Sequence, residues 1–191
     1  MKLRLVILAL GGSMLLLACG RSHVYDASVK QLDSLKVVVE QALDGYIKTD
    51  SASCRQVLNK QASYAAFMMS HVNDTIPANE AQTLREFYAT GTPLRHFFST
   101  RALLISDART SVQQLKNLSH DLTSGAVESE KAIGFINDEK IAAEKIISQL
   151  KQSTEQIHIQ LETFNRTLPV VENMARRYNQ GALPPVTPAE L

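Results

Sequence analysis

The 191-residue chain contains no tryptophan, and aromatic residues make up only 6% of it. Glycan-binding proteins usually present exposed aromatic rings, so this composition disfavours glycan binding. A large net charge is also missing, because 20 basic and 19 acidic residues leave a formal charge of +1. Binding to nucleic acid requires a basic stripe that neutralises phosphates. We therefore expect no nucleic-acid partner.

Sequence motifs that carry catalytic chemistry are missing as well. The chain has no Gly-x-Ser-x-Gly elbow, no phosphate-binding loop and no dinucleotide-binding fingerprint. Its five histidines are scattered, and no cluster of Cys, His and Asp has the spacing of zinc ligands. We expect neither an enzyme nor a bound cofactor. A catalytic triad assembled from distant helices, as in an envelope hydrolase, is a third possibility that nothing in the sequence supports.

Glu155 and His158 form the one pair whose spacing is that of a metal motif. Carboxylate-bridged di-iron bundles carry Glu-x-x-His on each of two helices. The other histidines of this chain have no carboxylate three residues before them. Glu155 and His158 also flank Ile157 instead of sharing its helical face. We expect both side chains to face solvent.

The N-terminal segment has the organisation of an export signal. Lys2 and Arg4 form a short basic region, and residues 5–17 are apolar apart from residues 11–13. This apolar run is too short to span a hydrocarbon core of ~30 Å as a helix. It ends in the sequence Leu16, Leu17, Ala18, Cys19, Gly20.

The block from Leu16 to Gly20 resembles the lipobox of bacterial lipoproteins, and the resemblance covers about the first tenth of the chain. It implies that the Cys19 sulfur receives a diacylglyceryl group and that cleavage separates Ala18 from Cys19. The new N-terminus then becomes a site for a further acyl chain such as palmitate. An ordinary secretory signal with a chance cysteine is the alternative interpretation.

Lipidation at Cys19 would make the membrane one partner of the chain. Two or three acyl chains anchor a protein stably where one would be marginal. In Gram-negative bacteria the family pattern uses an aspartate after the cysteine to retain lipoproteins at the inner membrane. Gly20 stands there instead. The resemblance therefore predicts a cell-envelope location, with the outer membrane favoured if the host is Gram-negative.

Cys54 would then be the only free thiol, so no intramolecular disulfide can form. It lies at helical spacing from Leu58, Ala65 and Met68, which predicts a buried structural thiol. An intermolecular disulfide in an oxidising periplasm is the alternative. Met68 and Met69 are similarly interpreted as core packing instead of an adaptable binding surface.

Almost all of the exported chain has the periodicity of helices. Apolar residues recur every three or four positions, and no stretch alternates in the manner of a strand. Residues 50–53 have the chemistry of a helix N-cap, and Ser124 with Gly125 that of a C-cap. The pattern predicts helices over residues 26–49, 54–72, 77–89, 92–123 and 133–178.

The last helix has the strongest pattern. Its apolar positions step by three and four from Ile133 to Tyr178, interrupted only by Lys140 and Thr154. A period near 3.5 held over this length predicts coiled-coil-like packing. Pro169 lies inside the run and should kink the helix near residues 165–166.

These elements predict an all-α fold, an antiparallel helical bundle of about four main helices with a long coiled-coil-like C-terminal hairpin. Its parts would be a signal peptide (1–18), a lipidated N-terminus and short tether (19–25), the bundle (26–180) and a Pro-rich disordered tail (181–191). Arg101 and Lys140 take seam positions. They would either form a polar layer that selects a partner or extend their charges to water along the apolar surface.

The first two helices are much shorter than the last one, so we expect part of its seam to stay open. The residues of this possible partner-facing seam are Ile147, Leu150, Ile157, Leu161 and Phe164. The sequence therefore predicts a non-enzymatic, lipid-anchored scaffold, spacer or protein-binding accessory, with a protein partner or self-association through the seam. A small-ligand or metal-binding four-helix bundle is the alternative.

Overall fold

The computed structural model describes residues 23–72 and 75–189, and within them the fold is all-α as predicted. None of the helices in these ranges is long and apolar enough to cross a membrane. The lipobox residues and Cys19 lie outside the described residues. The elements are the 3-10 turn η1 (His23–Tyr25) and the helices α1 (Asp26–Ile47), α2 (Ser51–His71), α3 (Ala78–Ala89), α4 (Gly91–Ser124) and α5 (Ser129–Tyr178).

The helix ends form where the sequence predicts caps. The Asp50 carboxylate accepts hydrogen bonds from the backbone N–H groups of Ala52 and Ser53, both at 3.0 Å, and so caps α2. Gly125 adopts the left-handed conformation at φ 72° and ends α4. The beginning of α2 and the end of α4 are therefore defined by local chemistry.

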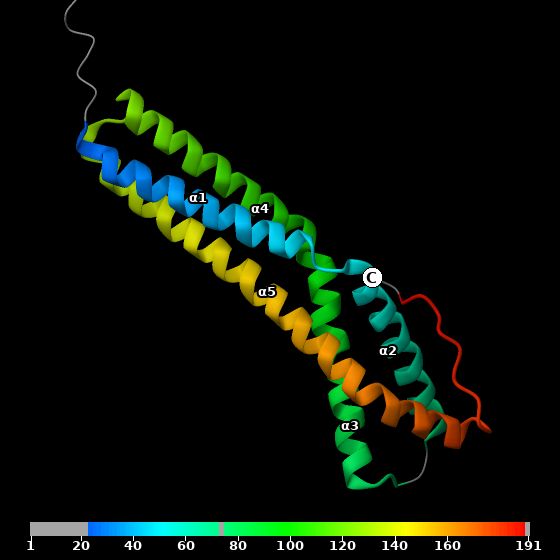
Figure 1. Cartoon of the computed structure of the whole chain (residues 1–191). Coiled ribbons are helices and arrows are strands. Elements are labelled where there is room, and N and C mark those ends of the chain that lie inside the picture. Colours follow the sequence, from blue (N-terminus) through cyan, green and yellow to red (C-terminus); the bar gives the residue numbers. More distant parts are fainter. Residues whose placement is uncertain (1–22, 73–74, 190–191) are drawn as a thin grey trace, which may run out of the picture.

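The helices assemble into an elongated bundle (Figure 1). α1 and α2 follow one another along it, α3 and α4 run back in the opposite direction, and α5 spans the whole length. α1 and α5 therefore run in the same direction, with α4 antiparallel to both. The predicted all-α bundle with its long α4–α5 hairpin is confirmed.

Burial along α5 repeats every seven residues. The same heptad position is buried in each successive heptad, and a repeat of seven residues is the packing period of a coiled coil. The same interval separates Leu32, Val39 and Tyr46 in α1. The buried heptad positions of α5 are Ile136, Ala143, Leu150, Ile157, Phe164 and Val171.

The buried side chains form two clusters, one toward each end of the bundle. The larger joins α1 and α4 to the first half of α5, with Leu58 and Cys54 of α2 at its edge. The smaller lies among α2, α3 and the last turns of α5, where the rings of Phe87 and Phe164 stack at 5.4 Å between centroids.

The expectation of an open seam on the last helix is not met. Leu150, Ile157 and Phe164 are buried in the two clusters, and Ile147 and Leu161 are half-buried against the larger one. The physical reason is that α1 and α2 lie end to end, not side by side. Together they cover a length of α5 that neither could cover alone. The seam is therefore occupied by the chain itself.

Two further predictions concern the C-terminal region. α5 continues through Pro169 as one helix, and the predicted kink stays a prediction. Residues 182–189 are extended, as expected, but they lie against α2 instead of extending freely into solvent. Hydrogen bonds from the backbone of this tail to side chains of α2 account for the difference.

Candidate functional site

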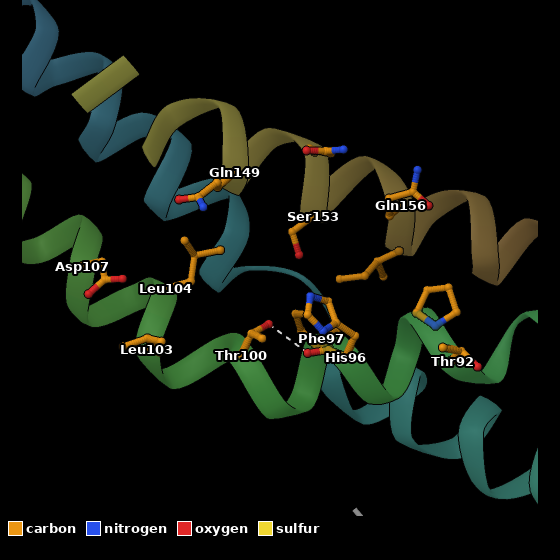
Figure 2. Close-up of a pocket in the computed structure, with 13 residues that line it drawn as sticks. Thr92, His96, Phe97, Thr100, Leu103, Leu104, Asp107, Gln149, Ser153 and Gln156 are labelled. Atoms are coloured by element: carbon orange, nitrogen blue, oxygen red, sulfur yellow. Dashed lines mark hydrogen bonds between the residues drawn. The ribbon is translucent and has the colours of Figure 1, made fainter. Parts of the chain in front are cut away.

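A groove between α4 and α5 is the candidate functional site (Figure 2). It has a volume of about 680 Å³ and is open to solvent along one side. α4 contributes residues between Thr92 and Asp107, and α5 contributes residues between Gln149 and Ile157. The groove therefore lies near the middle of the bundle, close to the place where α1 ends and α2 begins.

The floor of the groove is apolar. Phe97 and Ile157 are almost completely buried beneath it, and Leu104 is half-buried. Leu103 stands on the α4 side with 65% of its surface exposed. A large apolar side chain with this exposure at a concave site gives an approaching molecule apolar area to bury.

The α5 side of the groove consists largely of amides. Gln149, Gln152 and Gln156 recur at intervals of three and four, so they share one face of the helix. Thr92 and Thr100 add hydroxyl groups from α4, and the Thr100 hydroxyl donates to the His96 carbonyl at 2.8 Å. Amides both donate and accept hydrogen bonds, which suits them to binding an uncharged polar group such as a peptide backbone.

Among the described residues that line the groove, only His96 and Asp107 have ionisable side chains. They are eleven residues apart on one helix, which places them about 16 Å apart along its axis. Ser153 also lines the groove, but within the described structure no hydrogen bond joins its hydroxyl to His96. The arrangement offers a surface for binding and does not pair a nucleophile with a base.

Arg101 lies beside the groove and holds the end of α1. Its guanidinium donates hydrogen bonds to the backbone carbonyls of Tyr46, at 3.4 Å, and Ile47, at 2.9 Å. The same group stacks over the rings of Tyr46 and Phe97. A cation at a helix C-terminus also complements the helix dipole. Among the described residues, Arg101 thus contacts the last turn of α1.

The Tyr46 ring packs behind the groove, edge-on to Phe97 at 5.7 Å between centroids. The side chain is fully buried, and its hydroxyl makes no regular hydrogen bond to any described residue. Burial raises the pKa of this hydroxyl, and the nearby Ser153 and Arg101 offset the rise in part. Ser153 therefore lies between a buried phenol and the open groove.

Most of the other residues singled out from the sequence lie away from the groove. Glu155 and His158 are exposed, and the described residues contain no group of three His, Cys, Asp or Glu side chains that could hold a metal ion. Cys54 is fully buried, and burial followed by the charge of Asp50 raises the pKa of its thiol. Of the predicted seam residues, only Ile157 lines the groove.

Other residues singled out from the sequence also occupy ordinary structural positions. Met68 is buried as expected, whereas Met69 is 78% exposed, and Lys140 is half-buried. The groove was not predicted from the sequence. The regular interval of the three glutamines indicates a polar face on the last helix. The sequence does not show that α4 lies beside this face and forms a groove with it.

Comparison of the chain with protein-family models, with curated proteins and with solved structures found no match.

Proposed function

We propose that the chain is a lipid-anchored, non-enzymatic scaffold or spacer of the bacterial cell envelope that binds a protein partner in the α4–α5 groove. The observation that carries this proposal is the elongated bundle with the beginning of α1 at one extremity. The Tyr25 hydroxyl donates to the Ser129 carbonyl at 3.4 Å, so α1 begins beside the turn between α4 and α5.

An anchor at Cys19 would hold this extremity close to the membrane. The chain from Cys19 to His23 can span at most about 14 Å, even when fully extended. The 50 residues of α5 extend for about 75 Å from the same extremity. The bundle would therefore project the groove and the α2–α3 end away from the lipid surface. Gly20 after the cysteine favours the outer membrane if the host is Gram-negative.

The partner that the groove suits best is an uncharged polypeptide segment with apolar side chains. These side chains would cover Leu103 and the half-buried Leu104, and the three glutamines of α5 would bond to the polar groups beside them. The lining supplies little charge for electrostatic attraction, so we expect binding that depends weakly on salt.

A test of this proposal places a photo-crosslinking amino acid at position 103 of the chain in its native membranes. We expect irradiation to give one discrete adduct with a partner protein. The matched control carries the same group at Met69, which is equally accessible but lies on α2 outside the groove. Equal adducts from both positions would contradict a specific groove.

The anchor is tested in the same cells with the Cys19→Ser variant. We expect the unchanged chain to sediment with membranes and to carry the mass of its acyl chains. The variant should lose both properties, and its crosslink at position 103 should decrease because the groove is no longer held at the envelope. If Cys19→Ser remains membrane-bound without added mass, the anchor proposal is wrong.

The volume of the groove favours one second candidate function, the binding of a small ligand. Pockets for such ligands usually measure about 300–1,000 Å³, and the groove lies within this range. Native mass spectrometry of the purified chain distinguishes the two proposals. A bound small molecule that is lost on replacing Leu103 by Arg would favour the ligand over the protein partner.

A further inference from the structure

The C-terminal tail reverses direction after α5 and runs back along the outer side of α2 (Figure 1). Gln180 and Gly181 make the reversal with positive φ angles of 50° and 87°. Left-handed backbone is unfavourable for a residue with a Cβ atom such as Gln180. Residues 182–189 then follow α2 in an extended conformation. Contacts with α2 must offset the cost of the turn.

Two backbone N–H groups of the tail are bound by two side chains of α2. The Thr187 N–H donates to the Ser63 hydroxyl oxygen at 2.9 Å, and the Ala189 N–H donates to Asn59 Oδ1 at 2.9 Å. Both acceptors belong to side chains and both donors to the main chain. The Ser63 hydroxyl also lies within hydrogen-bond reach of the Thr187 carbonyl oxygen, at 3.4 Å, and of Thr187 Oγ1, at 3.3 Å, so the threonine side chain adds to the contact at this position.

The spacing of the two acceptors matches an extended chain. Asn59 and Ser63 are one helical turn apart, which corresponds to about 6 Å along α2. Two residues of an extended chain cover about 6.2–6.8 Å. Two successive turns of α2 therefore accept hydrogen bonds from two alternate N–H groups of an extended segment that runs antiparallel to the helix.

The prolines of the tail agree with this register. Pro184, Pro185 and Pro188 have no N–H group to donate. The next turn of α2 after Ser63 carries Phe67, which has no acceptor, and the next step along the tail is Pro185. Pro184 is buried, and Ala189 packs against the larger core cluster. The prolines also hold the segment extended before it binds, which lowers the entropic cost.

We propose that the Asn59–Ser63 face of α2 is a docking surface for an extended, proline-containing polypeptide segment, and that residues 182–189 occupy it as an internal competitor. A segment from a partner protein would displace the tail by using the same two acceptors. Residues 185–188 of the bound tail are exposed, so they bury little of their surface against α2. Such an attachment can be exchanged.

The tail and an added peptide would compete for the same two acceptors of α2, and the attachment of the tail to the chain sets the strength of this competition. A short flexible tether gives a segment an effective concentration in the millimolar range. We therefore compare the purified chain with its double variant Thr187→Pro and Ala189→Pro. The variant loses both N–H donors of the tail but keeps both acceptors of α2. The probe is a synthetic peptide with the sequence of residues 182–191.

We expect the peptide to shift the NMR signals of α2 amides saturably in the proline variant, with an affinity at least tenfold higher than for the unchanged chain. Adding Asn59→Ala and Ser63→Ala to the variant should weaken the binding at least tenfold. Circular dichroism establishes that the variants compared are folded. Equal affinity of the unchanged chain and the proline variant, or no saturable shift at millimolar peptide, would overturn the proposal.

A second probe tests the backbone recognition without altering the protein. The same peptide is methylated on the nitrogens that correspond to Thr187 and Ala189, which removes the two donors and leaves the side chains intact. We expect it to bind the proline variant at least tenfold more weakly than the unmethylated peptide. Equal binding would show that α2 does not recognise these N–H groups. These results are independent of the lipid anchor and of the α4–α5 groove.

Discussion

Gly91 illustrates how one missing side chain positions two helices. It begins α4 where this helix passes α2, and a Cβ there would lie 2.6 Å from Gln61 Oε1 and 2.9 Å from Gln61 Cδ. Gln61 is buried and donates to the Tyr88 carbonyl at 3.3 Å. The amide cannot move away without giving up that bond. Close approach between α2 and α4 therefore requires glycine at this position.

We expect Gly91→Ala to lower the free energy of unfolding by about 1–2 kcal/mol, because the clash with Gln61 outweighs the better helix propensity of alanine. The matched control is Gly134→Ala in α5, where an added Cβ meets no atom within 4 Å. It should stabilise the chain by about 0.5–1 kcal/mol. Urea denaturation measures both, and effects of the same sign would contradict this explanation.

Glu139 is the residue from which we expect a pH dependence. Burial raises the pKa of its carboxyl group above the usual 4.5, and the neighbouring charge of Asp138 raises it further. Its buried Oε2 atom has no hydrogen-bond partner among the described residues. The folded state therefore binds the proton more tightly than the unfolded state does. The unfavourable effect of Glu139 on folding therefore grows as pH rises from the usual pKa of a glutamate to the raised pKa of the folded state, and it is constant above that.

Glu139→Gln should therefore melt at a higher temperature than the unchanged chain at pH 7. The difference should disappear below about pH 4, where the carboxyl is protonated in both states. Glu144→Gln, at an exposed position of the same helix, is the control for a simple change of net charge. Thermal melts at the two pH values decide the matter, and a lower melting temperature for Glu139→Gln at pH 7 would refute it.

At the scale of the elements, much of the structure was predictable from local signals. The Asp50 cap, the Gly125 cap and the apolar periodicity delimit the helices without reference to any neighbour. The apolar pattern of the last helix begins at Ile133, whereas α5 begins at Ser129, because Ser129, Glu130 and Lys131 carry no apolar periodicity. Periodicity also identifies which face of a helix is buried. It does not identify the helix that covers that face.

Pro169 is the position where α5 departs from ideal helix chemistry. A proline has no N–H to donate to the carbonyl four residues earlier, that of Asn165. We expect Pro169→Ala to restore this bond and to raise the free energy of unfolding by about 1–3 kcal/mol. Pro185→Ala in the tail is the control for the changed entropy of the unfolded chain. If Pro169→Ala instead lowers the free energy of unfolding measured in urea, the proline ring is required for packing around α5.

At the scale of the whole molecule, the prediction of an open seam was wrong and the groove was not predicted. Both have the same physical reason. The first two helices are each much shorter than the last one, which suggested that part of α5 would stay bare. Residues 48–50 instead let α2 continue along the bundle, so that both helices cover α5 in series. The Arg101 bonds to the last carbonyls of α1 belong to this junction. No single-helix pattern contains that information.

The path of the tail decides where a label can be attached to this protein. Because Ala189 is bound beside Asn59, a fluorescent protein or affinity tag fused to the C-terminus would start near the middle of α2, not at the distal end of the bundle. Such a fusion would crowd the face that the tail covers. A reporter for the distal end belongs in the connection between α2 and α3, where an insertion leaves both the tail and the groove untouched.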